Sequence, residues 1–228
     1  MSQLVSIIIA TLNAAPYLKR ALDSIHNQTH THYEVIIVDG GSEDATLQIA
    51  KQYPFVKIMK QVGSGLAGAW NEGILAAKAN YIAFLDSDDY WDLHTLQWHL
   101  RAFEQNSNCE ASLGRVEYFL SEGVNKLPHG FKASLLNHSH FAYMPGCFMG
   151  KRSIFNKLGM FDESLQVTSD LIWFAQLKMS GMMIEKCQEV MLHKRVHEKN
   201  LSYTSAQALT YDQEITTVLH TLLHKKDR

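Results

Sequence analysis

Three carboxylates stand within four residues at positions 86–89 (DSDD), directly after the apolar run Tyr81–Leu85. Like charges so close together raise one another's pKa values unless a cation neutralises them. A hard divalent ion takes oxygen ligands and can bridge a carboxylate to a phosphate. A solvated acidic turn is the alternative interpretation. The position favours a binding site, because ligands of open α/β sheets bind beyond the carboxyl ends of the strands.

Polar residues also follow two earlier apolar runs. Thr11 and Asn13 come after Val5–Ala10, and Asp39 comes after Tyr33–Val38, followed by two glycines and a serine. Asp39 is placed to accept a hydrogen bond from a base N–H or a ribose hydroxyl, and the glycines let a ligand approach the backbone closely. Each segment alone is equally compatible with an ordinary turn. Together with residues 86–89 they predict one crevice.

The elements that position these residues follow a strand–helix order over the first ~90 residues. Strands are expected at residues 5–10, 33–38, 56–62 and 81–85, with helices after Asn13, from Ser42 and over 66–79. A continuous apolar, β-branched run such as Val5–Ala10 is typical of a strand that is covered on both faces. This order predicts a parallel sheet with helices on both sides.

The remainder of the chain is less regular. We expect a helix capped by Asp92, a strand at 109–120, a long loop at 121–144, helices at 151–158 and 167–179, and a short strand at 191–196. No linker separates the halves. We therefore expect one domain over residues 1–228, with a nucleotide-binding front (1–90), an irregular part (91–202) and a C-terminal helix (203–228).

Composition narrows the class of protein. The chain has 228 residues, 46% of them hydrophobic and 19% charged, and a formal net charge of −2, which excludes disorder and predicts no nucleic-acid partner. It has no apolar run of the ~18–20 residues that a bilayer span needs, and no signal peptide is predicted. Its three cysteines are expected to be reduced thiols of a cytoplasmic protein. Peripheral contact with the inner membrane through the basic cluster 224–226 is the alternative to packing of that segment on the domain.

Seven motifs in order carry a family resemblance: VSIIIATLN, YEVIIVDGGSEDAT, GLAGAWNEGI, YIAFLDSDD, GCFMGKRSIFNKLGMFDESL, SDLIWFAQL and RVHEKNLS. Over about residues 4–202 the chain resembles the family 2 inverting glycosyltransferases of the GT-A fold. The resemblance implies a Rossmann-type, mostly parallel central sheet flanked by helices, with an irregular C-terminal acceptor-side part. It also implies Mg²⁺- or Mn²⁺-dependent transfer of a sugar from a nucleotide-sugar donor, a UDP-sugar being favoured, to a glycan or lipid-linked acceptor in cell-surface polysaccharide or glycan synthesis.

The resemblance also implies roles for individual residues. Those expected at the nucleotide-sugar donor are Thr11, Asn13, Asp39, Asn71, Asp86 and Ser87, with Asp39 on the uracil or ribose. Asp88 and His197 are the implied metal ligands, and Asp170 matches the acid that serves as general base. Two positions depart from the family pattern, because Trp70 stands where an arginine is usual and Ser169 where a glutamate is common.

Three alternatives remain open at this point. Asp162 is the rival for the general base, although a structural cap is favoured for it. The glycines at 63–68 (GSGLAG) match the GxGxxG pattern of NAD(P)-binding oxidoreductases, but two strand–helix units precede them, whereas that pattern normally belongs to the first. A non-catalytic nucleotide-sugar-binding module would keep Asp39 and the acidic turn without needing Asp170.

Overall fold

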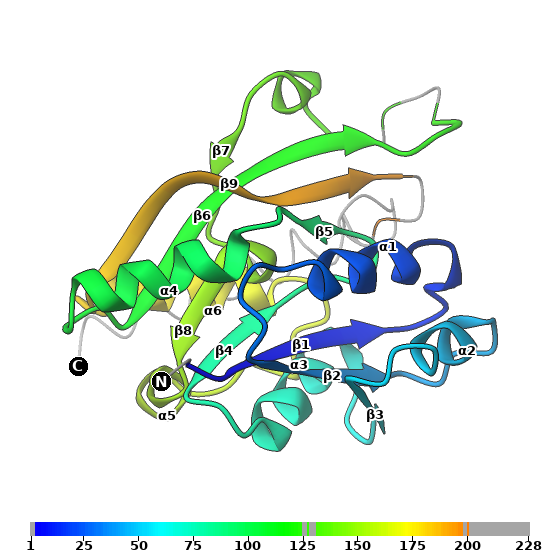
Figure 1. Ribbon diagram of the computed structural model, residues 1–228, viewed down its shortest axis with the longest axis horizontal. Coiled ribbons are helices and arrows are strands. Elements are labelled where there is room, and N and C mark those ends of the chain that lie inside the picture. Colours follow the sequence, from blue (N-terminus) through cyan, green and yellow to red (C-terminus); the bar gives the residue numbers. More distant parts are fainter. Residues whose placement is uncertain (1–2, 125–126, 128–130, 198–199, 201–228) are drawn as a thin grey trace.

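The computed structural model describes residues 3–124, 127, 131–197 and 200, and these residues form one mixed sheet with helices on both faces (Figure 1). The strands are β1 (Val5–Thr11), β2 (Tyr33–Asp39), β3 (Val56–Lys60), β4 (Tyr81–Phe84), β5 (Tyr90–Trp91), β6 (Ala111–Leu120), β7 (His140–Phe141), β8 (Phe148–Lys151) and β9 (Ile184–Val196). The helices are α1 (Ala15–His26), α2 (Thr46–Ala50), α3 (Gly65–Ala76), α4 (Thr95–Gln105), α5 (Ser153–Leu158) and α6 (Ser169–Met179), with short 3₁₀ turns η1 (Ala133–Leu136) and η2 (Pro145–Cys147).

The front of the sheet is parallel, as the sequence predicts. The strand order is β3-β2-β1-β4-β8-β6-β9-β5, with β7 beside β6. The β1–β2 register runs from Val5 opposite Tyr33 to Thr11 opposite Asp39, and β4 lies parallel to β1 on its other side. The carboxyl ends of β1, β2 and β4 therefore meet at one edge of the sheet. The expected α/β class with a central sheet and flanking helices is confirmed.

The back of the sheet contains elements that the sequence pattern does not reveal. β8 is antiparallel to both β4 and β6, and β5 is antiparallel to β9. β9 pairs in parallel with β6 and spans 13 residues, so the short strand expected at 191–196 is only its second half. The first half reads IEKCQEV and is mostly exposed or half-buried, so it lacks the apolar run that marks a buried strand.

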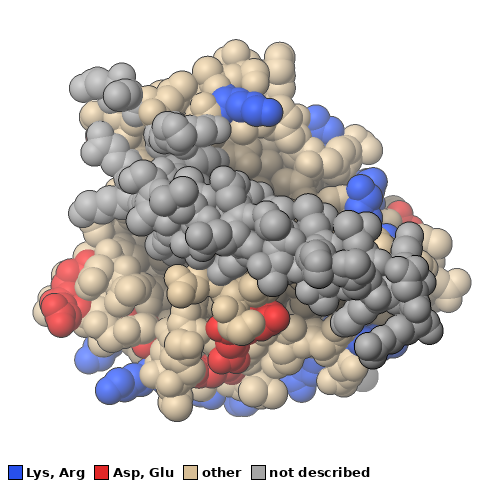
Figure 2. Space-filling view, turned by 180° about the vertical axis from the view of Figure 1, so that it is seen from behind, with Lys and Arg blue, Asp and Glu red and all other residues tan. Residues whose placement is uncertain are grey.

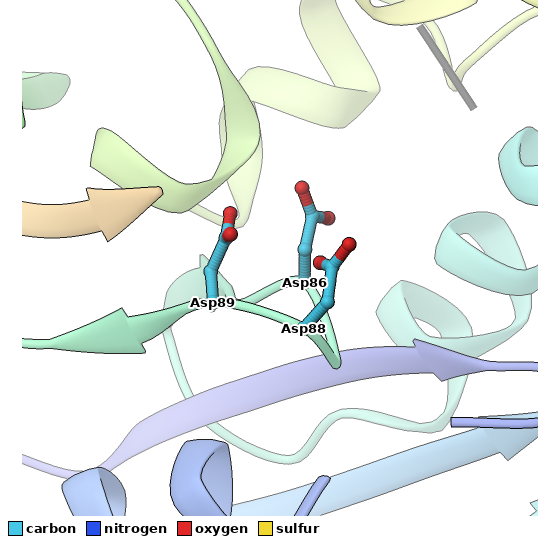
Figure 3. Close-up of side chains that lie close together, drawn as sticks. All are labelled: Asp86, Asp88 and Asp89. Carbon is cyan, nitrogen blue, oxygen red and sulfur yellow. The ribbon is translucent and has the colours of Figure 1, made fainter. Parts of the chain in front are cut away.

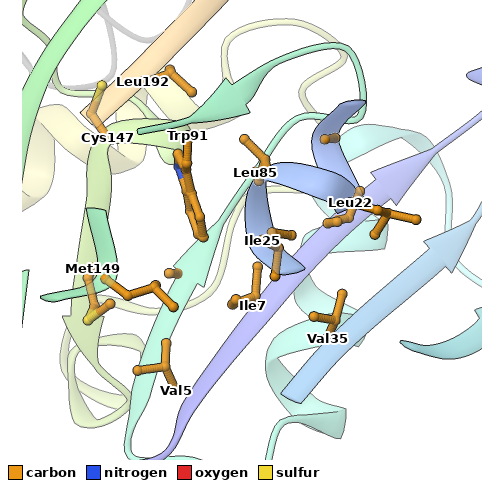
Figure 4. Packing of buried hydrophobic residues seen from close by; sticks show 14 of the residues in the cluster. Val5, Ile7, Leu22, Ile25, Val35, Leu85, Trp91, Cys147, Met149 and Leu192 are labelled. Atoms are coloured by element: carbon orange, nitrogen blue, oxygen red, sulfur yellow. The ribbon is translucent and has the colours of Figure 1, made fainter. Parts of the chain in front are cut away.

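Each face of the sheet has its own apolar core. Ile7 and Ile9 of β1 belong to the core under α1 and α4, whereas Ile8 between them belongs to the core under α3, α5 and α6. Leu22 and Ile25 of α1 pack toward β1 and β2 in Figure 4. This alternation is what a strand covered on both faces requires.

The helices confirm some local expectations and correct others. α1 buries the face that the sequence spacing defines, with Pro16 in its first turn. The helix expected from Ser42 instead begins at Thr46, because the Ser42 hydroxyl bonds to Asp39 and so belongs to the preceding turn. α3 packs so closely on β1 that a Cβ on Gly73 would lie 2.4 Å from the side chain of Ile8.

Three further observations concern the whole described chain. None of the described helices has the length and apolar character that crossing a bilayer requires. All three cysteines are unpaired thiols.

Seen from behind, acidic side chains gather in the lower middle and at one edge, while Lys and Arg lie mainly around the rim (Figure 2). The helix expected at 203–228 and the basic cluster 224–226 lie outside the described residues.

Candidate active site

The turn after β2 closes on the carboxylate of Asp39. Oδ1 accepts hydrogen bonds from the hydroxyls of Thr11 (3.1 Å) and Ser42 (2.6 Å), and Oδ2 accepts from the backbone N–H of Gly41 (3.0 Å) and of Ser42 (2.9 Å). Asn13 adds a second tie across the turn, since its backbone N–H donates to Ser42 Oγ and its side-chain oxygen accepts from Glu43. Asn13 adopts the left-handed conformation with φ 51°.

These bonds decide how Asp39 can meet a ligand. Burial alone would raise the pKa of Asp39, but the hydrogen bonds from Ser42, Gly41 and Thr11 outweigh burial and lower it. Asp39 therefore stays ionised and carries four hydrogen bonds from its own neighbourhood. A base or ribose group that bonds to this carboxylate has to share or replace one of them, so the expected contact stays a prediction.

The acidic turn after β4 is organised from the other end of the chain. Asp86, Asp88 and Asp89 point to the same side of the turn (Figure 3), and one ligand oxygen from each lies within 4.8 Å of the others. The ammonium of Lys194, in β9, donates to Asp86 Oδ2 at 3.0 Å and to Asp89 Oδ2 at 2.9 Å. Burial alone would lower the pKa of Lys194, but the charges of Asp89, Asp86 and Asp88 raise it well above its ordinary value.

Asp89 and Asp88 have different surroundings. Asp89 is buried, and its Oδ1 accepts the backbone N–H of Arg195 at 2.8 Å. Burial raises the pKa of Asp89. Asp88 is half-buried, and its Oδ2 accepts from Nε2 of His197 (3.0 Å) and from the amide of Asn200 (3.3 Å). Burial also acts against ionisation of Asp88, but His197 and Lys194 outweigh it and lower the pKa of Asp88.

His197 is fixed by stacking as well as by Asp88. The ring of Tyr17, in α1, stacks on the imidazole with centroids 4.7 Å apart and planes at 24°. The guanidinium of Arg195 lies 5.0 Å from the centre of the Tyr17 ring and donates from Nε to the Asp88 carbonyl at 2.9 Å. Helix α1 and the C-terminal end of β9 therefore meet at His197.

The donor set around Asp88 fits a hard divalent cation. The hydrogen bonds above use Oδ2 of Asp88, which leaves Oδ1 of that carboxylate for an ion, whereas Asp86 is engaged by Lys194. In the described geometry Nε2 of His197 carries the proton that it donates to Asp88. A cation held by both residues would replace that proton. The assignment of Asp88 and His197 as metal ligands stays a prediction.

Asp170 lies in the first turn of α6. Burial raises its pKa to about 6, with the negative charge of Asp86 adding to the rise and Lys194 opposing it. The carboxyl is therefore close enough to the acidic turn to sense its charges. Its rival Asp162 is exposed and accepts the backbone N–H and hydroxyl of Ser164, so it stabilises a local turn and does not cap a described helix.

Asn71 has a structural environment in α3. Its amide donates to the Phe161 carbonyl and to Glu163 Oε1, both at 2.9 Å, and its oxygen accepts the Phe161 N–H at 3.0 Å. These bonds tie α3 to the segment before α6, and donor binding by Asn71 stays a prediction. Trp70, at the position where the family commonly has arginine, is buried against Phe84 and Phe161, so it does not replace the missing cation.

Two carboxylates from other segments lie against the beginning of the glycine-rich segment 63–68. Glu72 accepts the backbone N–H groups of Val62 and Gly63 at 2.9 and 2.6 Å. A Cβ on Gly63 would lie 3.1 Å from Glu163 Oε2 and 3.2 Å from Glu72 Oε1. In a dinucleotide-binding turn, these backbone donors would face a pyrophosphate. Two carboxylates at this place would repel it, which argues against the oxidoreductase alternative.

Sequence reasoning missed the residues that complete the site from a distance. Lys194, Arg195 and Asn200 contact the acidic turn across more than 100 positions of sequence, and Tyr17 contacts His197. A usable signal existed for Lys194. It is a lysine inside an expected strand, and the three aspartates at 86, 88 and 89 need a cation.

Comparison with known proteins identifies the family. A sequence model described as "Glycosyl transferase family 2" matches residues 6–159. The chain belongs to glycosyl transferase family 2. An uncharacterised glycosyltransferase of Rickettsia typhi is 32% identical over 222 residues, covering 91% of this chain and 69% of the relative. The minor teichoic acid biosynthesis protein GgaA of Bacillus subtilis is 32% identical over 191 residues, covering 75% of this chain and 42% of that protein.

Solved structures of glycosyltransferases share the fold. TarS of S. aureus, residues 1–349 in complex with UDP, superposes with a TM-score of 0.67 at 20% identity, covering 84% of this chain and 60% of that TarS chain. The mannosyltransferase PcManGT of Pyrobaculum calidifontis, in complex with GDP-Man and Mn²⁺, has a TM-score of 0.68 at 19% identity, covering 96% of this chain and 65% of that enzyme. The GT-A fold expected for a family 2 glycosyltransferase is therefore confirmed, and the chain is shorter than these neighbours.

Proposed function

We propose that this glycosyltransferase moves a sugar from a nucleotide-sugar donor, with a UDP-sugar favoured, to an acceptor hydroxyl with inversion at the anomeric carbon. The observation that carries the proposal is the placement of Asp170. Its carboxyl belongs to a different element from the acidic turn, yet the charge of Asp86 reaches it and burial raises its pKa to about 6. A carboxylate with that pKa can remove a proton near neutral pH.

The proposed reaction is a single displacement. Asp170 takes the proton of the acceptor hydroxyl while that oxygen forms a bond to the anomeric carbon. The bond from that carbon to the donor's β-phosphate oxygen breaks, and its electron pair leaves with the nucleoside diphosphate. No covalent intermediate on the protein is needed, because attack and departure occur on opposite faces of the sugar.

The acidic turn supports the donor side of this reaction. A bound Mg²⁺ or Mn²⁺ would neutralise the charge that develops on the leaving diphosphate. Asp88 and His197 are the residues proposed to hold it, with Tyr17 and Asn200 keeping the pair in place. Asp86 and Ser87 face the donor sugar or ribose in this proposal, and Thr11, Asn13 and Asp39 form the floor beneath the nucleotide.

The comparisons support the proposed substrate classes. TarS is described with UDP and PcManGT with GDP-Man and Mn²⁺, so nucleotide-sugar donors and a divalent cation fit this fold. GgaA is described as a teichoic acid biosynthesis protein. We therefore propose a glycan or lipid-linked acceptor in cell-surface polysaccharide synthesis.

The test is a thermal-shift panel of nucleotides and nucleotide sugars with and without Mn²⁺, because a ligand of the native state raises the midpoint by mass action. UDP is expected to stabilise the protein only when metal is present. In calorimetry, Asp88→Asn is expected to abolish metal-dependent UDP binding with the fold retained, because an amide lacks the charge a hard cation requires. Wild-type affinity in Asp88→Asn would show that the metal site is misassigned, and stabilisation by NAD(H) without metal would reinstate the oxidoreductase alternative.

A further inference from the structure

Lys194 is the least expected group in the site. Its ammonium contacts carboxylate oxygens of both Asp86 and Asp89, and its side chain is only 17% exposed. Asp89 is held from the other side by the backbone N–H of Arg195. The protein itself therefore supplies a cation to the acidic turn, the ammonium of Lys194 in β9.

The contacts divide the turn into two sides. Asp86 and Asp89 share the ammonium of Lys194, whereas Asp88 faces His197 and Asn200. A divalent ion and an ammonium compete for the same carboxylate oxygens, and each repels the other. The Lys194 side is thus unfavourable for a divalent ion, and the Asp88 side remains.

We propose that Lys194 is a resident cation that confines divalent-metal binding to the Asp88 side of the acidic turn. The inference rests on the proposed function, because it assigns a role inside the same metal site. Lys194 is a positioning residue: it acts on the metal by holding Asp86 and Asp89. When it is removed, Asp86 becomes an additional ligand and the ion is bound more tightly and in a different place.

The experiment measures Mn²⁺ alone, by calorimetry and by the loss of its free-ion EPR signal, on the full chain without nucleotide. Lys194→Met keeps the length of the side chain and removes the ammonium. We expect it to bind Mn²⁺ at least about tenfold more tightly than wild type, or to bind a second equivalent, because a nearby competing charge is lost. Lys186→Met is the matched control, since Lys186 is an exposed lysine of the same strand, and it should stay within about twofold of wild type.

A second variant distinguishes competition for ligands from a change in net charge. It also avoids leaving Asp89 buried without its ammonium partner, which could unfold the single variant. Asp89→Asn/Lys194→Met removes both buried charges and leaves the net charge of the turn unchanged. The proposal expects this variant also to bind Mn²⁺ more tightly than wild type, because Asp86 has lost its ammonium partner. Wild-type affinity in the double variant would overturn the proposal.

The outcomes also separate this inference from the proposed function. If wild type binds Mn²⁺ and neither variant binds it more tightly, Lys194 is not a competing cation and the metal site itself stands. If wild type binds no Mn²⁺ while the variants do, Lys194 excludes the ion from the whole turn, so the inference fails together with metal dependence of the natural enzyme. If none of the three binds Mn²⁺, both are wrong. In turnover, Lys194→Met should lower kcat more than it changes KM for the donor, as misplacement of the ion requires.

Discussion

Two turns with buried or half-buried aspartates lie at the same edge of the sheet, the Asp39 turn and the acidic turn at 86–89, and they receive their hydrogen bonds from different parts of the chain. The carboxylate of Asp39, the last residue of β2, receives its four hydrogen bonds from its own turn and from Thr11 on the neighbouring strand. Asp86 and Asp89, after β4, receive theirs largely from Lys194 and Arg195, over 100 residues later. The hydrogen bonds of the Asp39 turn are therefore local in sequence, whereas the acidic turn has its partners only when β9 is in place.

This difference separates stability from function. A carboxylate that its own turn has already satisfied is expected to matter mainly for the fold, because removing it leaves buried donors unpaired. The carboxylates after β4 are balanced by residues distant in sequence, and the charge of Asp86 acts on the pKa of Asp170. The predictions below test this division, beginning with the largest effect.

Asp170→Asn should lower turnover by roughly 10²–10⁴-fold, because an amide cannot accept the acceptor's proton. Donor and metal affinity should remain nearly unchanged, since Asp170 is assigned to the acceptor. Steady-state transfer and calorimetric donor binding measure the two quantities. Asp162→Asn is the control and should retain turnover. The reverse result would make Asp162 the base, and full activity in both variants would favour a base elsewhere or a non-catalytic binding module.

The rate should fall about tenfold per pH unit below pH 6, as the Asp170 carboxylate becomes protonated. Asp86 and Lys194 are the charged groups that act on it, and Asp86 has the larger influence. Titration of Asp170 by itself does not unfold the protein. A carboxyl whose pKa is raised in the folded state stabilises the fold as pH falls through about 6 toward its unfolded value. A pH profile of kcat/KM, with circular dichroism at each pH, checks both statements, and a flat profile between pH 5 and 7 would contradict them.

Asp39→Asn should lower the free energy of unfolding by about 1–3 kcal/mol, because the amide turns a donor toward donors of its own turn. Urea unfolding measures the change. Glu43→Gln removes a charge from the same loop without breaking a described side-chain bond, and it should change stability by less than about 0.5 kcal/mol. Unchanged stability in Asp39→Asn, with donor affinity lost, would show that this turn too is built for the ligand.

Tyr17→Leu should weaken Mn²⁺-dependent UDP binding by about threefold to tenfold, the equivalent of a lost aromatic stack of about 0.5–1.5 kcal/mol. Tyr17→Phe preserves the ring over His197 and should bind like wild type. Calorimetry at fixed Mn²⁺ compares them. Equal weakening in both variants would assign the effect to the hydroxyl and not to the stack.

The sequence predicts the fold best where local pattern and burial agree. β1, β2, β4 and α1 are apolar at the spacing that their environment needs, and the positions of Asp39 and of residues 86–89 follow directly from the strand ends. The motifs likewise lead to Asp88 and His197, which the structure places 3.0 Å apart.

The remainder depends on contacts that no local pattern encodes. The first half of β9 is a strand because β6 offers it a partner, although its residues are mostly polar. The Ser42 hydroxyl donates to Asp39 in the turn that follows β2, and the helix that it was expected to cap begins only at Thr46. Lys194 acquires its role from a partner 105 positions earlier, a separation that neither periodicity nor spacing can indicate.

The position of β9 late in the sequence affects the order in which the site can form during synthesis. The carboxylates of residues 86–89 leave the ribosome more than 100 residues before the ammonium of Lys194, whereas β1, β2 and β4 are complete by then. Parallel pairing of β9 with β6 is a non-local step, and such steps are slow because a long loop must close first. The acidic turn therefore lacks its counter-charge until β9, which comes last among the strands of the described residues, has been synthesised and has paired with β6.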